Sequence, residues 1–125
     1  MQRLIAACAV TLAAAGASAP VAAHHGAGLF EPETEITVTG TVTEFQFVNP
    51  HVLIYVAVDG ERKGTWGGEL TSPNRLARMS GAVPWHKNVL VPGERLTMTG
   101  HPARNGAPAM SVTKLVKADG AVLFE

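Results

Sequence analysis

An alternation of apolar and hydroxyl side chains over residues 36–43 (ITVTGTVT) does most to limit the folds open to this chain. A period of two is typical of a β-strand that buries one face and exposes the other. The apolar positions then change parity at Phe45 and Phe47, with no turn in between. Such a change of face requires a bulge or a sharp coil, and Gly40 is the nearby residue that would permit one. The sequence therefore predicts a long, bent first strand.

Further strands are predicted after Asn49-Pro50, which ends the first one. Residues 51–58 (HVLIYVAV) are almost continuously apolar, as expected of the most buried strand. The remaining predicted strands are residues 64–70, 95–100, 109–116 and a short terminal strand at 121–124. Turns at Asp59-Gly60, Pro92-Gly93 and Asp119-Gly120 precede the first, second and last of these strands, and a loop at 101–108 precedes the third.

One short helix is predicted over residues 71–81, between the third and fourth strands. Ser72 is the expected N-cap, Pro73 occupies the first helical position, and Gly81 follows the end. Three strands, a helix and two strands, with a bent first strand, match an OB-like five-stranded barrel with a short strand appended. The predicted fold class is therefore all-β with one short helix, and a small β-sandwich is the alternative.

The first 23 residues have the pattern of a secretory signal peptide, with Arg3 near the start and an apolar run over residues 4–17. Cleavage after Ala19 and cleavage after Ala23 both fit, and we favour the second, which leaves His24 at the new terminus. The predicted organisation is a signal peptide (1–23), a flexible N-terminal segment (24–34) and a barrel domain (35–125). No later run of 18 apolar residues predicts a transmembrane anchor, so we expect a soluble exported protein, periplasmic or secreted.

Charge and cysteine content exclude several classes of function. The 125 residues contain 10 basic and 10 acidic side chains, and without residues 1–23 the formal net charge is −1, which argues against binding to nucleic acid. The single cysteine, Cys8, lies in the leader, so the exported chain would have no disulfide and no thiolate. Both aspartates lie in Asp-Gly turns and no nucleophile motif is present. We therefore predict no catalytic residues and favour a non-enzymatic role.

Five histidines are the most suggestive feature for function. After cleavage at Ala23, His24 would offer its amine and its imidazole, a nitrogen pair suited to Cu(II), with His25 beside it. His51 and His101 border the loops that flank the ligand-binding face of an OB barrel, so they could converge with the terminal pair. His86 is expected on the surface. The alternative is that all of these histidines are simply solvated.

Other residues are candidates for binding an organic ligand. Asn49 and Pro50 form a rigid loop that could present a polar edge to a ligand. Trp66 and Trp85 could stack on sugars or bases, although Trp66 shares a strand face with Leu70, which favours core packing.

Two carboxylates, Glu69 and Glu44, are expected to be partly buried, and one of them facing a histidine in a pocket would favour an enzyme. Arg75 and Arg78, three residues apart on the predicted helix, form a basic strip typical of a solvated face.

Several segments occur together in this chain: the His24-His25 pair, the segment Gly40-Thr41-Val42-Thr43-Glu44-Phe45 leading to Asn49-Pro50-His51, the segment 69–73, Pro92-Gly93-Glu94, and Gly100-x-Pro102-Ala103-Arg104-Asn105-Gly106. In this combination the chain resembles a family of small exported bacterial proteins of unknown function. The chain departs from the family pattern at Gly26, where a serine is usual, at Glu31, where an aspartate is common, and at Trp85, which comes four residues after Gly81 instead of directly after it. The resemblance implies export and one intact domain, and it leaves the function open.

Two hypotheses follow from the sequence. The first is an exported, non-enzymatic binding module that binds copper or another transition metal through the terminal histidines. The second is a module that binds a peptide, a glycan or a protein, with no metal. The identity of the ligand and the oligomeric state stay open, and an exposed edge at residues 122–124 could allow a homodimer to form by strand pairing.

Overall fold

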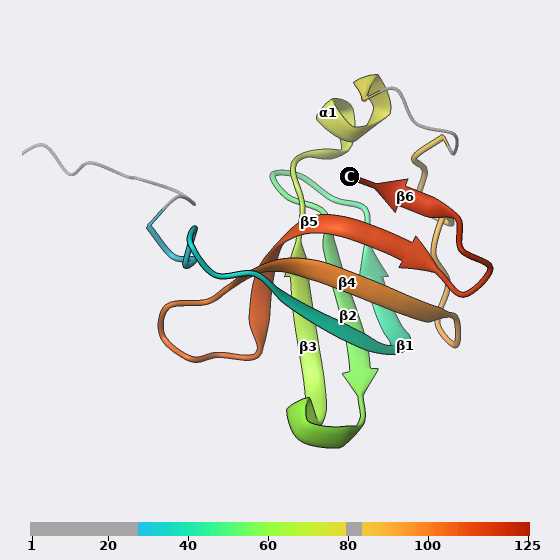
Figure 1. Cartoon of the computed structure of the whole chain (residues 1–125). Helices are drawn as coiled ribbons and strands as arrows, with labels where there is room; N and C mark the ends of the chain where they lie inside the picture. Colours follow the sequence, from blue (N-terminus) through green and yellow to red (C-terminus); the bar gives the residue numbers. More distant parts are fainter. Residues whose placement is uncertain (1–27, 80–83) are drawn as a thin grey trace, which may run out of the picture.

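A computed structural model describes residues 28–79 and 84–125 of the chain. It is a small β-barrel with one short α-helix at one end (Figure 1). The elements are β1 (Ile36–Gln46), β2 (Leu53–Val58), the 3-10 turn η1 (Gly60–Arg62), β3 (Gly64–Glu69), α1 (Pro73–Arg78), β4 (Arg95–Pro102), β5 (Ala109–Lys117) and β6 (Val122–Phe124).

The strands form one sheet in the order β3-β2-β1-β4-β5-β6, and a parallel pairing of β3 with β5 closes it. In the closing pair Gly67 lies opposite Ala109 and Glu69 opposite Ser111, while the other strand pairs are antiparallel. A closed barrel of five strands, with the helix between β3 and β4, is the architecture that the order of the elements predicts. The OB-like barrel is therefore confirmed, and the alternative of a β-sandwich is not.

The bend in β1 comes from a bulge, as its change of parity predicts. Val42 pairs with Val56 but Glu44 pairs with Tyr55, so Thr43 is the extra residue. Gly40, which we expected to permit the bend, has a different role. A Cβ atom at Gly40 would lie 2.4 Å from the Ala57 carbonyl oxygen, so this glycine allows the backbones of β1 and β2 to approach closely.

Strand β2 buries alternate residues although its composition is almost continuously apolar. Ile54, Val56 and Val58 are buried, whereas Leu53 and Tyr55 are half-buried. The strand thus alternates like its neighbours, because the barrel has only one interior and the other face of β2 lies outside it. Three of its six residues are buried, a larger share than in β1, β3, β4 or β5, as predicted for the most buried strand.

The helix begins as predicted, and it is shorter than predicted. The Ser72 Oγ accepts a hydrogen bond from the Arg75 backbone N–H at 3.3 Å, and Pro73 occupies the first turn. The helix ends at Arg78, and the expected stop at Gly81 lies outside the described residues. Leu76 is fully buried and joins the helix to the core.

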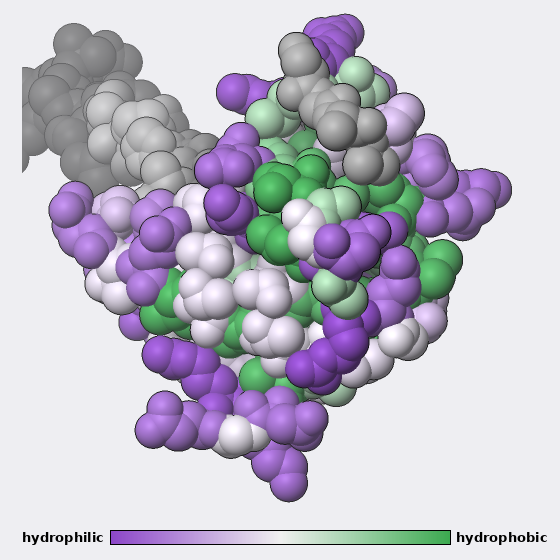
Figure 2. All heavy atoms as spheres, turned by 45° about the vertical axis from the view of Figure 1, so that its right-hand side comes forward, coloured by the Kyte–Doolittle hydropathy of each residue, from purple (hydrophilic) through white to green (hydrophobic). Residues whose placement is uncertain are grey.

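The interior of the barrel is apolar, and no polar or charged side chain of the described residues is buried in it. Among its largest fully buried side chains are Ile54, Leu76, Leu90, Leu96, Met98, Met110 and Leu115. Figure 2 shows apolar side chains reaching the surface in a patch near one end of the molecule, surrounded by hydrophilic ones.

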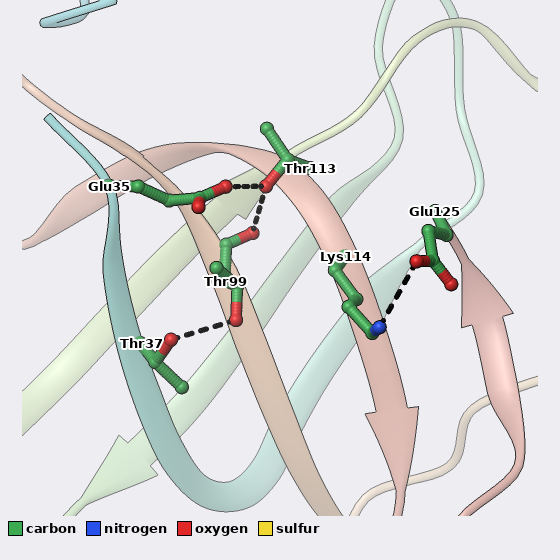
Figure 3. A network of polar contacts seen from close by, with 6 residues as sticks. All are labelled: Glu35, Thr37, Thr99, Thr113, Lys114 and Glu125. Atoms are coloured by element: carbon green, nitrogen blue, oxygen red, sulfur yellow. Dashed lines mark hydrogen bonds and ion pairs between the residues drawn. The ribbon is translucent and has the colours of Figure 1, made fainter. Parts of the chain in front are cut away.

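Hydroxyl groups dominate part of the outer face of β1, β4 and β5 (Figure 3). The Thr37 and Thr99 hydroxyls lie 2.8 Å apart, and the Thr113 hydroxyl lies 2.6 Å from Glu35 Oε1 and 3.3 Å from the Thr99 carbonyl oxygen. The Thr39 and Thr97 hydroxyls also lie 2.8 Å apart, so Thr37 and Thr39 of the first strand each pair with a threonine of β4. Over the described part of the chain, no helix is long and apolar enough to cross a membrane.

Candidate functional site

A hollow of about 540 Å³ is lined by residues that include Arg75 of α1 and Phe124 of β6. Figure 1 shows α1 and the C-terminus at the same end of the barrel. The polar lining of the hollow consists of His51, Glu69, Thr71, Arg75, His101 and Ser111. Its apolar lining consists of Phe30, Pro32, Leu70, Met79, Val112 and Phe124. A hollow of this size with a few convergent polar groups is typical of a small-ligand site.

His51 and Glu69 form an ion pair in the wall of the hollow. His51 follows the loop between β1 and β2, and Glu69 is the last residue of β3. The His51 Nδ1 and Glu69 Oε1 atoms lie 2.5 Å apart, and the two side chains are 42% and 31% exposed. At this exposure the pair contributes at most about 1 kcal/mol to stability, so its main effect is to orient the imidazole. An ionised carboxylate only accepts hydrogen bonds, so we assign the proton to Nδ1. The Nε2 atom is then left for other partners.

His101 is held in a similar way. It lies in β4, where the strand approaches the β4–β5 loop, and its Nδ1 atom is 2.8 Å from the Thr34 carbonyl oxygen. A carbonyl oxygen only accepts, so Nδ1 donates and Nε2 is left with its lone pair when the ring is neutral. Two imidazoles that line one hollow thus each have Nδ1 engaged by an oxygen.

Residues of the N-terminal segment, Phe30 and Pro32, form part of the wall of the hollow. This segment is attached to the β4–β5 loop. Phe30 forms an isolated β-bridge with Ala103, and the Arg104 backbone N–H donates to the Leu29 carbonyl oxygen at 2.9 Å. The Arg104 side chain donates to the Phe30 carbonyl oxygen through Nε at 3.0 Å and pairs with Glu31 at 3.5 Å. These contacts place Phe30 in the wall of the hollow, five residues after His25 in the sequence.

Three hydrogen-bond donors of the lining are unused. The hydrogen bonds of the described side chains do not involve the Thr71 and Ser111 hydroxyls. The Arg75 side chain is exposed, and no carboxylate of the described residues lies within 4 Å of its guanidinium. Glu69, by contrast, is engaged by His51.

Of the residues predicted from the sequence, His51, Glu69 and His101 come together in the hollow. Asn49 and Pro50 are exposed, are joined by a cis peptide bond and do not line it. The predicted ligands His24 and His25 lie outside the described residues.

The two tryptophans lie elsewhere. Trp66 belongs to the core and its indole N–H donates to the Arg62 carbonyl oxygen at 2.8 Å, an environment that the pattern of its strand favours. Trp85 is partly buried against Phe45, with ring centroids 6.5 Å apart. His86 is exposed, as expected. Glu44 is exposed and accepts a hydrogen bond from Gln46, so the expectation that it is partly buried is wrong.

Several lining residues carry no signal in the sequence. Phe30 belongs to a segment that the sequence marks only as flexible, and Phe124 and Ser111 read as ordinary strand residues. Arg75 reads as part of a solvated face. All four come together only through the closure of the barrel and the packing of the helix, which no local pattern encodes.

The described residues do not hold a metal by themselves. Within residues 28–79 and 84–125, no three His, Asp or Glu side chains are grouped so that they could hold a metal ion. The hollow can therefore contribute ligands to a metal site, and a complete coordination sphere would require donors from elsewhere.

Comparison with known proteins identifies the family. No curated protein matches the chain. The model of a family of unknown function, DUF6152, matches residues 11–111, which is most of the chain. The chain therefore belongs to this family of unknown function, DUF6152.

Proposed function

We propose that this protein is an exported, non-enzymatic binding module that holds a transition metal ion, copper in the first place, at the histidine-lined hollow. The observation that supports this is the engagement of Nδ1 in both His51 and His101 by an oxygen acceptor. Metal-binding histidines usually donate their second ring N–H to a carboxylate or a carbonyl, which fixes the ring and leaves the other nitrogen for the metal. Imidazole nitrogen is a preferred ligand of copper and zinc.

The remaining ligands would come from the new terminus. Removal of the leader after Ala23 would give His24 a free amine and an imidazole, with His25 next to it. His25 precedes Phe30 by five residues, and an extended chain covers at most about 17 Å over that length. Because Phe30 lines the hollow and is bridged to Ala103, the terminal histidines would be attached within reach of His51 and His101.

A titration of the exported form with Cu(II), followed by calorimetry, tests the metal site. His51→Ala and His101→Ala should each weaken binding about tenfold or more, since each removes one ligand. His86→Ala is the matched control, because His86 is exposed and does not line the hollow. Binding no tighter than that of an unstructured His-His peptide, or binding unchanged by His51→Ala, would refute the metal site.

Export and the terminal amine are tested by the mass of the protein recovered from the cell envelope or the medium. A mass that corresponds to a chain beginning at His24 supports the proposal. Cleavage after Ala19 would place the His24 amine in a peptide bond and remove half of the proposed ligand pair.

General acid–base chemistry is the second candidate function. A carboxylate that faces a histidine in a pocket is the arrangement of an oriented general base, and His51 and Glu69 meet that description. Hydrolysis of a simple activated ester by chelator-treated protein, abolished by His51→Ala and retained in His86→Ala, would favour this function over metal binding.

A module without metal, for a peptide or a glycan, has less support. An exposed Trp66 in an apolar groove would have favoured it, and Trp66 is buried. A smaller groove of about 220 Å³ does lie over Tyr55 and Gly67 and shares Phe30 and Glu69 with the hollow. It is on the face of β2 and β3 that OB barrels use for ligands, so a peptide side chain is the occupant to test there.

A further inference from the structure

The hollow contains hydrogen-bond donors that no other described group uses. The Arg75 guanidinium has no carboxylate partner among the described residues, and the Thr71 and Ser111 hydroxyls make no hydrogen bond to another described side chain or backbone group. The one carboxylate of the lining, Glu69, is already paired with His51. Arg75 is therefore the charged group of the lining that has no partner among the described residues.

The rest of the lining is apolar and includes two aromatic rings. Phe30 enters from the N-terminal segment and Phe124 from β6, and both are partly buried. Leu70, Met79 and Val112 complete an apolar wall. Apolar walls with a few donors are suited to an organic molecule that has an anionic end and an apolar body.

We propose that the hollow binds a small organic carboxylate, whose carboxylate is held by Arg75 with the hydroxyls of Thr71 and Ser111 and whose apolar body lies against Phe30 and Phe124. Guanidinium binds a carboxylate through two parallel hydrogen bonds, which gives an exposed arginine both affinity and orientation. The carboxylate site needs no metal. Carboxylate binding can therefore be tested in metal-free protein, separately from the proposed binding of copper.

Binding of benzoate to the chelator-treated, leader-free protein tests this site, with chemical shifts of the backbone amides as the readout. Benzyl alcohol is the control ligand, since it has the same ring and no charge. Benzoate should produce saturable shifts below about 10 mM, a range that covers the weakest specific complexes. Benzyl alcohol should bind at least tenfold more weakly.

Arg75→Gln should weaken benzoate binding tenfold or more. Arg78→Gln is the matched control, because Arg78 is exposed on the same helix and does not line the hollow. Both substitutions are on the surface and should leave the thermal midpoint unchanged, so a loss of binding would not reflect unfolding.

Three results would each overturn the proposal. The first is an absence of saturable chemical-shift changes with benzoate and also with hexanoate, a carboxylate with an aliphatic body tested in the same way. The second is equal affinity for benzoate and benzyl alcohol. The third is an equal loss in Arg75→Gln and Arg78→Gln, which would indicate a general effect of charge. Copper binding measured on the same preparations reports on the proposed function separately.

Discussion

His51 depends on Glu69 for its orientation, and this dependence is testable at the level of single side chains. Replacement of Glu69 by Gln keeps the size of the side chain and removes the charge that holds Nδ1 at 2.5 Å. If Nε2 of His51 is a metal ligand, loss of the carboxylate should weaken Cu(II) binding about tenfold to a hundredfold, as measured by calorimetry.

Glu44→Gln is the matched control for this prediction. Glu44 is exposed, accepts a hydrogen bond from Gln46 and does not line the hollow. Copper affinity that is the same in Glu69→Gln and in Glu44→Gln would show that Glu69 does not orient a ligand. Because the ion pair with His51 is partly exposed, the free energy of unfolding should change by less than about 1 kcal/mol in either variant.

Two glycines bring backbones so close together that no side chain fits between them. A Cβ atom at Gly100 would lie 2.2 Å from the Ser111 carbonyl oxygen, and at Gly40 the same contact to Ala57 is 2.4 Å. Gly40→Ala and Gly100→Ala should each lower the free energy of unfolding by about 1 to 3 kcal/mol, since the strands must move apart. Gly28→Ala, which meets nothing within 4 Å, should stay within about 0.5 kcal/mol in the same urea titration. Equal stability of all three variants would contradict the close approach.

Among the elements, the helix is too short to be stable alone and is held by the barrel. It has six residues, and isolated helices below roughly 12 residues are marginal in water. Its fixed point is Leu76, which is fully buried in the core. Leu76→Ala should therefore lower the free energy of unfolding by about 2 to 5 kcal/mol, whereas Leu29→Ala, at a side chain that is 62% exposed, should change it little. A small effect at Leu76 would mean that the helix does not plug the barrel.

The turn before β4 makes the stability of the barrel dependent on pH. The Glu94 Oε2 atom accepts the Val91 backbone N–H at 2.7 Å and its Oε1 lies 3.1 Å from Lys117 Nζ. The hydrogen bond from Val91 first, and then Lys117, hold the pKa of Glu94 below its ordinary value, although burial opposes them. A carboxylate with a lowered folded-state pKa stabilises the fold above its unfolded pKa, and this contribution is lost as the pH falls through the folded pKa.

Comparison of the wild type with Glu94→Gln across pH measures this contribution. The wild type should be the more stable at pH 7, and the difference should shrink as the pH falls below about 4, where glutamates titrate. Glu61→Gln, at an exposed residue of η1, is the control and should leave the stability profile unchanged. A difference between wild type and Glu94→Gln that stays constant down to low pH would contradict the assignment.

At the scale of the whole molecule, the sequence predicts the barrel well and its hollow poorly. Alternation, turn residues and the Ser72-Pro73 cap are local signals, and they place the strands and the start of the helix within a few residues. The apolar run at residues 51–58 identifies the most buried strand, but composition does not show that only alternate residues of β2 face the interior. The pairing of His51 with Glu69 and the entry of Phe124 into the wall depend on contacts between distant elements, which only the closed sheet creates.

Removal of the segment before Glu35 tests whether the barrel folds without the residues that the proposed binding sites require. The buried core residues of the described chain all lie at Val38 or later, so a protein that begins at Glu35 should still unfold cooperatively. It would lose the bridge between Phe30 and Ala103 and the contacts of Arg104, about 1 to 2 kcal/mol together. The thermal midpoint should then fall by roughly 4 to 16 °C.

In this truncated protein the affinities for Cu(II) and benzoate should fall much more than the stability. Truncation removes Phe30 and Pro32 from the wall of the hollow and the Thr34 carbonyl that holds His101, together with both terminal histidines. Titrations with Cu(II) and with benzoate should each lose tenfold or more in affinity relative to the full exported chain. A truncated protein that fails to fold would show that the segment belongs to the domain. One that folds and binds both probes as tightly as the full chain would place their sites away from the hollow.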